Sequence, residues 1–213
     1  IMMMAVHPLR ARFGVERIVV STYQAVSGAG AAGMVELERM TRAALDGRAE
    51  EPQKFIEDCA FNVFSHDSAM DPVTGRNVEE QKMIDESRKI WDDPAVRVAA
   101  TCVRVPVMRA HTESINQTLR EPATEADVRD AIGAMPGVTV SDDRAGNRYP
   151  TPRRASGMDD CLVGRIRGDE SQESADGPGG ARVFKGFDLL VSGDQLRKGA
   201  ALNAVQIAEL VCA

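Results

Sequence analysis

The spacing of apolar residues along the chain predicts a mixture of helices and strands. Apolar positions with a helical period predict helices over residues 1–12, 34–45, 78–91 and 195–211. Another helix is expected between Thr124, which caps its start, and Gly137, which lies beyond its end. Runs rich in β-branched residues predict strands over residues 17–24, 96–108, 138–140, 161–167 and 187–191. Residues 48–77 are expected to be irregular, and residues 168–180, rich in Asp, Glu, Ser and Gly, to form a mobile hairpin loop.

Strands and helices do not alternate regularly, which favours an α+β fold over a doubly wound parallel sheet. The strands after residue 138 have connections short enough for antiparallel pairing. We therefore predict one domain over residues 1–213, with a mixed, largely antiparallel sheet covered by helices. No capping residue precedes the helix over residues 1–12, so we expect this helix to be truncated and the chain to be part of a longer protein.

Composition narrows the classes of function. The chain has 26 basic and 32 acidic residues, a net charge of −6 and 4% aromatic residues, which argues against nucleic-acid binding through overall charge or base stacking. No apolar run approaches the roughly 20 residues that a membrane span needs. The cysteines are widely spaced and form no C-x-x-C pair, so we predict neither a metal site nor disulfides, but reduced thiols in an intracellular protein. They are Cys59, Cys102, Cys161 and Cys212.

Residues 28–33 read Gly-Ala-Gly-Ala-Ala-Gly, a G-x-G-x-x-G string between a predicted strand and a predicted helix. In a dinucleotide fold such a loop holds a phosphate, and a second strand ends in an acidic residue about 20 positions later. Here Asp46 instead lies at the end of the following helix. A dinucleotide fingerprint, a loop that lets a ligand approach the backbone, and a plain turn all stay open.

Four polar residues stand out beside apolar segments. Arg104 lies within an apolar strand, so its guanidinium needs a carboxylate from the protein or from a ligand. His111 follows seven residues later, an odd offset that puts the two side chains on opposite faces of a straight strand unless the chain bends near Pro106. Glu79 and Lys82 are i,i+3 neighbours on a helix, for which a surface ion pair is the simplest interpretation.

Taken together, these segments closely resemble the aspartate-semialdehyde dehydrogenase family. The likeness runs in order through nearly the whole chain and departs mainly in the acidic, glycine-rich insertion after Arg167. The matching stretches are residues 19–30 (VVSTYQAVSGAG), 60–63 (AFNV), 101–107 (TCVRVPV), 149–152 (YPTP), 163–167 (VGRIR) and 196–206 (LRKGAALNAVQ).

The resemblance implies an α+β domain like the carboxyl-terminal domain of glyceraldehyde-3-phosphate dehydrogenase. It also implies reduction of β-aspartyl phosphate by NADPH through a cysteine thioester, on the way to lysine, threonine and methionine. The family's nucleophilic cysteine would lie a few residues before Ile1, and the nucleotide-binding domain would precede it. Residues 194–213 would form a helix that packs against that domain.

Site roles also follow from the resemblance, residue by residue. His111 matches the acid/base histidine, which would take the thiol proton and later serve the tetrahedral intermediates, and Gln24 matches the glutamine that orients the acyl group. Three residues match substrate-binding positions: Arg104 for the α-carboxylate, Glu79 for the amino group and Lys82 for the phosphate.

The remaining matches concern the cofactor and the setting of the enzyme. Ser27, Gly28 and Gln195 match positions beside NADP. A homodimer or homotetramer in the cytoplasm is implied, or in a plastid if the source is a photosynthetic eukaryote. Neither nucleic acid nor membrane is an expected partner.

Two alternatives stay open. One is a related acyl-phosphate reductase such as N-acetyl-glutamyl-phosphate reductase, although an acetylated amine has no charge for Glu79 to meet. The other is a non-catalytic association module, which the retention of all the matched site residues argues against.

Overall fold

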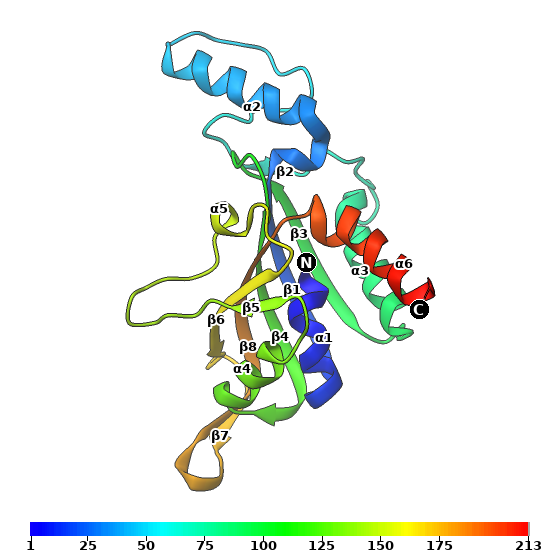
Figure 1. The fold of residues 1–213 in the computed structure, drawn as a ribbon, viewed down its shortest axis with the longest axis vertical. Coiled ribbons are helices and arrows are strands. Elements are labelled where there is room, and N and C mark those ends of the chain that lie inside the picture. The colour runs from blue at the N-terminus through cyan, green and yellow to red at the C-terminus, as the bar shows by residue number, and fades with distance from the viewer. Residues whose placement is uncertain (213) are drawn as a thin grey trace.

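An eight-stranded sheet forms the centre of the computed structural model, which describes residues 1–212 (Figure 1). The strands lie in the order β2-β3-β1-β4-β8-β6-β5, and β7 pairs with β8. Their bounds are β1 Val15–Gln24, β2 Phe64–Ser65, β3 Arg97–Arg104, β4 His111–Ala123, β5 Val138–Val140, β6 Cys161–Gly168, β7 Ser174–Asp176 and β8 Arg182–Gly193.

The sheet is mixed and largely antiparallel. β1 pairs in parallel with β3, and β5 pairs in parallel with β6. The pairs β1–β4, β2–β3, β4–β8, β6–β8 and β7–β8 are antiparallel. The predicted fold class is therefore confirmed. Residues 17–60 contain β1 and α2 (Gly30–Leu45) and do not form a doubly wound parallel sheet.

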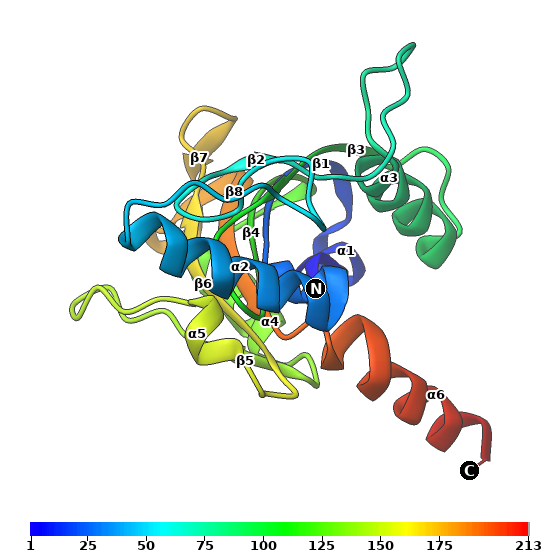
Figure 2. The same cartoon turned by 90° about the horizontal axis from the view of Figure 1, so that it is seen from above.

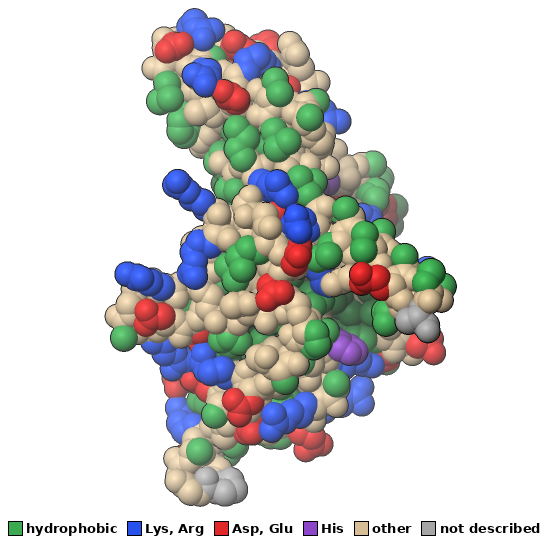
Figure 3. Space-filling model, viewed as in Figure 1, with side chains coloured by type: hydrophobic (Ala, Val, Ile, Leu, Met, Phe, Trp, Pro, Cys, Tyr) green, Lys and Arg blue, Asp and Glu red, His purple; other side chains and the backbone are tan. Residues whose placement is uncertain are grey.

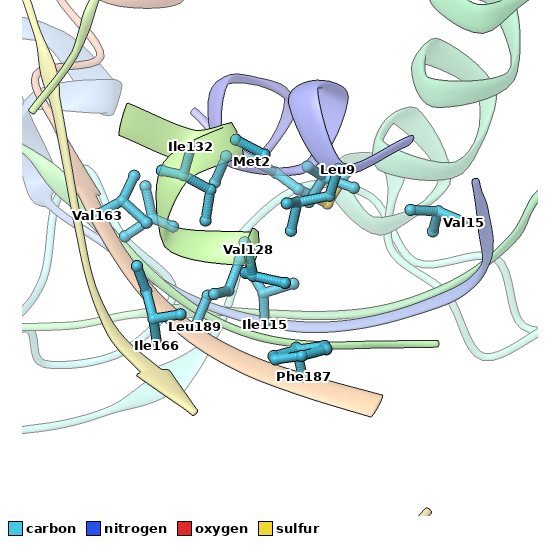
Figure 4. Close-up of a cluster of buried hydrophobic side chains, with 14 of the residues drawn as sticks. Met2, Leu9, Val15, Ile115, Val128, Ile132, Val163, Ile166, Phe187 and Leu189 are labelled. Carbon is cyan, nitrogen blue, oxygen red and sulfur yellow. The ribbon is translucent and has the colours of Figure 1, made fainter. Parts of the chain in front are cut away.

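Two helices, α1 (Met2–Phe13) and α4 (Glu125–Gly133), cover one face of the sheet and close the main core. Figure 4 shows Leu9 of α1 and Ile132 of α4 facing Ile115, Phe187 and Leu189 of the sheet. Each of these five side chains is at most 2% exposed. Since side chains alternate between the two faces of a strand, Ile115 and Leu119 of β4 and Phe187, Leu189 and Val191 of β8 join this core from the same face.

Two helices, α3 (Val78–Trp91) and α4, have capping boxes at their starts. α3 packs against β3, and its Asn77 and Glu80 exchange side-chain and backbone hydrogen bonds. Thr124 and Asp127 form the same box at the start of α4, as the sequence predicts. The box fixes the first turn of α3, the turn that carries Glu79 and Lys82.

The opposite face of the sheet carries small and polar side chains. Tyr23 is 41% exposed, and Ala99, Thr101 and Ser114 are exposed as well. Thr101 and Ser114 lie in register on either side of Ser21 in β1, so the exposed positions run across three strands. We call this surface, defined by Tyr23, Ala99, Thr101 and Ser114, the open sheet face.

Two helices extend away from the sheet. α2 packs on a second apolar cluster with Phe55 and Phe64, and its Val35 and Leu45 are exposed. At the top of Figure 3, where α2 lies, hydrophobic side chains are exposed among charged ones. α6 (Leu202–Cys212) projects from the body (Figure 2), and over its described residues it buries no side chain. A four-residue helix, α5 (Pro152–Ala155), precedes β6. Within residues 1–212, none of the helices has both the length and the apolar character that crossing a membrane requires.

Several boundaries differ from the predicted ones. The strand predicted over residues 96–108 ends at Arg104, where the chain leaves the sheet before Pro106. The last helix begins at Leu202 rather than at residue 195, because Lys198, Gly199 and Ala200 have non-helical backbone angles. Residues 168–180 include the short strand β7. β4, the central strand, was not predicted at all.

Candidate active site

A cavity of about 760 Å³ opens where β1 and β3 end and β4 begins. Seven of the eight residues that the sequence singled out line it: Gln24, Gly28, Glu79, Lys82, Arg104, His111 and Gln195. The eighth, Ser27, is 1% exposed, and its hydroxyl accepts a hydrogen bond from the Gln195 amide at the edge of the cavity. The expected convergence of these residues, which come from separate segments, is therefore found.

Arg104 and His111 reach the same cavity because the chain leaves the sheet between them. β3 ends at Arg104, residues 105–110 form a loop in which Ala110 has a positive φ of 72°, and β4 starts at His111. Both side chains bind Ala25, the residue after β1: Arg104 Nη1 donates to its carbonyl oxygen at 3.2 Å, and its N–H donates to His111 Nδ1 at 3.0 Å. The odd offset is thus resolved by a bend.

His111 is held in one neutral form. Nδ1 accepts the Ala25 N–H, so in a neutral ring the proton lies on Nε2. Burial lowers the pKa of His111 to about 3, and the nearby positive charge of Arg104 adds to this effect. A Cβ built on Gly28 would lie 3.6 Å from Nε2, which places that nitrogen on the cavity side of the glycine loop. The geometry therefore favours His111 as a hydrogen-bond donor toward the cavity.

We expect the His111 ring to stay neutral, with its proton on Nε2, between about pH 8 and pH 5, where an unperturbed histidine titrates. The pKa is lowered, so protonation sets in only as the pH falls toward that low value. Long-range ¹⁵N–¹H NMR correlations of the imidazole in the 213-residue chain report the tautomer and its titration. A peptide with the sequence around His111 is the control, and a His111 midpoint near that of the peptide contradicts this prediction.

Arg104 is 3% exposed and most of its hydrogen-bond donors have partners. Nε and Nη2 both donate to Asp67 Oδ1, at 3.3 and 2.7 Å. Nη2 also lies 2.8 Å from His66 Nε2, and the guanidinium stacks over the Phe55 ring, with its carbon 5.6 Å from the ring centroid. The carboxylate that the sequence analysis requires for this buried arginine is thus Asp67.

A row of polar side chains leads from the sheet to the surface. Thr22 donates to Gln24 Oε1 at 3.1 Å, the Gln24 amide donates to Glu79 Oε1 at 3.3 Å, and Lys82 donates to Glu79 Oε2 at 3.2 Å. Lys82 keeps 52% of its side chain exposed, against 28% for Glu79. The i,i+3 ion pair expected from the sequence is therefore present, and it forms one wall of the cavity.

The glycine loop places backbone close to the polar groups. A Cβ on Gly28 would lie 3.3 Å from Arg104 Nη1, so a larger residue here would crowd the guanidinium. Gly33 packs the start of α2 onto the loop, since a Cβ there would lie 2.7 Å from the Val26 carbonyl oxygen. Of the three interpretations of residues 28–33, the geometry supports a close-approach loop.

Sequence reasoning missed several residues of the cavity wall, among them His66, Asp67 and Glu113. His66 and Asp67 lie in the segment expected to be irregular, where nothing in the spacing marks them. Burial, with a contribution from the Arg104 charge, lowers the pKa of His66. In Asp67, the hydrogen bond and charge of Arg104 outweigh burial and lower the pKa. Burial raises the pKa of Glu113, which is 6% exposed.

Among the described residues, no cysteine lines this cavity. Cys59, Cys102 and Cys161 are buried, and burial raises the pKa of each thiol, to about 11 for the first two. Cys212 is exposed at the end of α6. Residues 1–212 also contain no cluster of three or more His, Cys, Asp or Glu side chains arranged to hold a metal ion.

The rim of the cavity carries the three residues that the resemblance assigns to the cofactor. Gln195 Oε1 is buried without a hydrogen-bond partner among the described residues, beside the Ser27 hydroxyl. A buried amide oxygen with no partner is costly, so an additional donor fits there. These two residues, with Gly28, are therefore compatible with the cofactor edge that the resemblance implies.

Comparison with known proteins gives one consistent result. Residues 6–198 match the family model described as "Semialdehyde dehydrogenase, dimerisation domain". Proteins named aspartate-semialdehyde dehydrogenase are 44% identical in Synechocystis, over 99% of this chain and 59% of the relative, and 42% identical in Aquifex aeolicus, over 99% and 58%. The chain thus spans about three fifths of the length of these relatives.

Solved structures agree with this result. Aspartate semialdehyde dehydrogenase II of Vibrio cholerae, complexed with ASA, superposes with a TM-score of 0.90 at 39% identity, over 99% of this chain and 59% of that one. The Francisella tularensis enzyme gives a TM-score of 0.84 at 30% identity, over 100% of this chain and 62% of that one.

Proposed function

The chain belongs to the semialdehyde dehydrogenase family, through its dimerisation domain, and we propose that it is the substrate-binding and acid–base portion of an aspartate-semialdehyde dehydrogenase. The reaction is the NADP-dependent reductive dephosphorylation of β-aspartyl phosphate to aspartate semialdehyde, in lysine, threonine and methionine biosynthesis in the cytoplasm. The observation that carries this proposal is the convergence of Arg104, His111, Glu79, Lys82 and Gln24 on one cavity.

Three charged residues divide the recognition of the substrate. Arg104 binds the α-carboxylate, for which a planar guanidinium is suited. Glu79 takes the α-ammonium group, and Lys82, whose side chain is half exposed, takes the phosphate arriving from solvent. Their contacts in the absence of substrate support this division, because the Glu79–Lys82 pair already places a cation next to an anion at the cavity wall.

His111 acts on the oxygen of the reacting carbonyl. Its Nε2–H donates a hydrogen bond to the oxyanion of the tetrahedral intermediate and keeps its proton, because a neutral ring that lost this proton would become an imidazolate. Gln24 orients the acyl group from the end of β1. The nucleophilic cysteine comes from a part of the enzyme outside this chain. The resemblance also implies that His111 first takes the thiol proton. For this step Nε2 needs a free lone pair, so the ring proton must lie on Nδ1, and the hydrogen bond from the Ala25 N–H to Nδ1 is lost.

Ser27, Gly28 and Gln195 hold the cofactor edge of the cavity. NADPH, when bound, supplies the hydride. The Gln195 amide offers its unpartnered oxygen to the cofactor and donates to Ser27, while Gly28, which has no side chain, keeps the loop clear of Arg104 and His111.

The remaining surfaces fit an assembly. The chain pairs with a second copy, as a homodimer or a homotetramer, through the open sheet face, whose small side chains allow close approach of another sheet. α6 packs against the nucleotide-binding domain, since Val205, Ile207 and Leu210 are 56%, 59% and 82% exposed on it. A helix with this much apolar surface in water is typical of one that packs in the complete protein.

A chimera tests the proposed function. The part of the Synechocystis relative that precedes its match to Ile1 is fused to this chain, and phosphate-dependent reduction of NADP by aspartate semialdehyde is followed. We expect turnover with this substrate and none with N-acetyl-glutamate semialdehyde. The Synechocystis enzyme is the positive control. A soluble, folded chimera that uses the N-acetylated substrate, or neither substrate, contradicts the proposal.

A further inference from the structure

The arginine proposed to bind the substrate carboxylate is already bound to a carboxylate of the chain. Asp67 Oδ1 takes the Nε and Nη2 donors of Arg104, and His66 Nε2 takes another Nη2 donor. Ala25 accepts from Nη1. A guanidinium has five N–H donors, so these contacts leave one, on Nη1, which is the nitrogen next to Gly28. One donor cannot hold a carboxylate with two parallel hydrogen bonds.

A substrate carboxylate can therefore take Arg104 fully only by displacing Asp67. Asp67 lines the same cavity, and its side chain is 18% exposed against 4% for Arg104, so the aspartate is the partner that can turn away. Once displaced, the Asp67 carboxylate has lost its ion-pair partner but stays partly buried near His66 and Arg104. An unpaired charge in such a place is unfavourable.

The α-ammonium group of an amino acid resolves this problem. It arrives on the same molecule as the α-carboxylate, so one ion pair, Arg104–Asp67, is exchanged for two, Arg104–carboxylate and Asp67–ammonium. A plain carboxylate brings no cation and must compete with Asp67 for Arg104. The exchange thus favours a ligand that carries both a carboxylate and an ammonium group. Asp67 competes with any carboxylate for Arg104, and only such a ligand gives Asp67 a new cation to pair with.

We propose that Asp67 is a specificity-determining residue that occupies Arg104 in the free protein and is exchanged onto the substrate α-ammonium group on binding. This inference rests on the proposed function, because it takes Arg104 as the carboxylate-binding residue. It adds a second acid to Glu79, and the two act differently. Glu79 attracts the ammonium, whereas Asp67 both attracts the ammonium and excludes carboxylates that lack one.

L-Aspartate and succinate are matched probes, since they differ only in the amino group. Their binding to the 213-residue chain is followed by NMR, through the backbone amides and the Nε–H resonance of Arg104. Wild type should bind L-aspartate more tightly than succinate. Asp67→Asn should tighten succinate binding by about tenfold. It should leave the affinity for L-aspartate within about threefold of the wild-type value, because the substitution removes both the competitor for Arg104 and the partner of the ammonium group.

Variants separate this mechanism from its rivals. Glu79→Gln should weaken the binding of L-aspartate without tightening the binding of succinate. Asp71→Asn, which removes a nearby exposed carboxylate that bonds only within its own turn, should change neither. If Asp67 merely positions Arg104, Asp67→Asn weakens both ligands, and that result overturns the inference.

One outcome does not depend on whether Asp67→Asn folds, and one further variant separates the inference from the proposed function. In the wild type, L-aspartate should shift the Arg104 Nε–H resonance, which donates to Asp67 in the free chain, and an unshifted resonance at saturation overturns the exchange. Arg104→Lys should weaken both ligands. If Arg104→Lys weakens the binding of neither ligand, the proposed function of Arg104 fails. If Arg104→Lys weakens both but Asp67→Asn does not tighten succinate binding, only the inference about Asp67 fails.

Discussion

Replacing His111 with alanine in the chimera is expected to lower kcat by about 10²–10⁴-fold and to change KM for aspartate semialdehyde far less. The ring donates from Nε2 to an oxygen that carries charge only in the tetrahedral intermediate. Its loss therefore destabilises the transition state more than the bound substrate. Steady-state kinetics of the two proteins measure the split between kcat and KM.

The control for this substitution is His7→Ala. His7 is exposed on α1, where Nδ1 accepts a hydrogen bond from the Trp91 indole at 3.2 Å, away from the cavity wall. Its replacement should leave both constants within about twofold, as for surface residues in general. A His111→Ala chimera with nearly unchanged kcat would remove His111 from the reaction, and a large loss confined to KM would make it a binding residue.

Much of the fold could be predicted because the pattern along the chain is local. The β-branched residues 17–24 coincide with most of β1, and the capping residues Thr124 and Asp127 begin α4 as expected. The first turn of α3, with its two acids and Lys82, also follows from local spacing. In these segments short-range preferences and tertiary packing agree, so the sequence signal is strong.

The central strand escaped prediction because its buried face is partly polar. Inward positions of β4 include Glu113 and Gln117 next to Ile115 and Leu119, and the two polar side chains break the apolar alternation that marks a half-buried strand. The Gln117 amide has no hydrogen-bond partner among the described residues, although it is fully buried. Only the neighbouring strands β1 and β8, which pair with β4 along its length, fix this segment in the sheet.

Many of the polar residues that line the cavity could be picked out from the sequence, but their hydrogen-bond partners could not. Arg104 needed a carboxylate, and the spacing of the chain could not supply one, because Asp67 lies 37 positions earlier in a segment without a periodic pattern. His66 lies in the same segment, so its place beside Arg104 can be identified only from the structure. The bend between Arg104 and His111 likewise depends on Ala110 adopting a positive φ, which a residue with a Cβ rarely adopts and which no local signal indicates.

The 213-residue chain tested by itself is expected to show no dehydrogenase activity. Thioester chemistry needs a thiolate within reach of His111. Burial raises the pKa of the thiols of Cys59, Cys102 and Cys161, which keeps them protonated at neutral pH, and none of the three lines the cavity. For the cofactor, the chain offers the loop at residues 27–30 and Gln195, so we expect very weak NADPH binding.

The assay is the phosphate-dependent reduction of NADP by aspartate semialdehyde on the purified chain, with the chimera as the positive control. Phosphate should still bind near Lys82, since this side chain is half exposed, and a phosphate-induced NMR shift that Lys82→Ala abolishes shows that the site is formed. If the chain is inactive although its anion site is intact, the cause is chemical: no cysteine within residues 1–212 lines the cavity, and the residues at 27–30 and Gln195 alone hold the cofactor too weakly. Measurable turnover that is lost when one of Cys59, Cys102, Cys161 or Cys212 is changed to serine would instead place the nucleophile within this chain. In that case, the resemblance that puts the nucleophile before Ile1 has been applied wrongly.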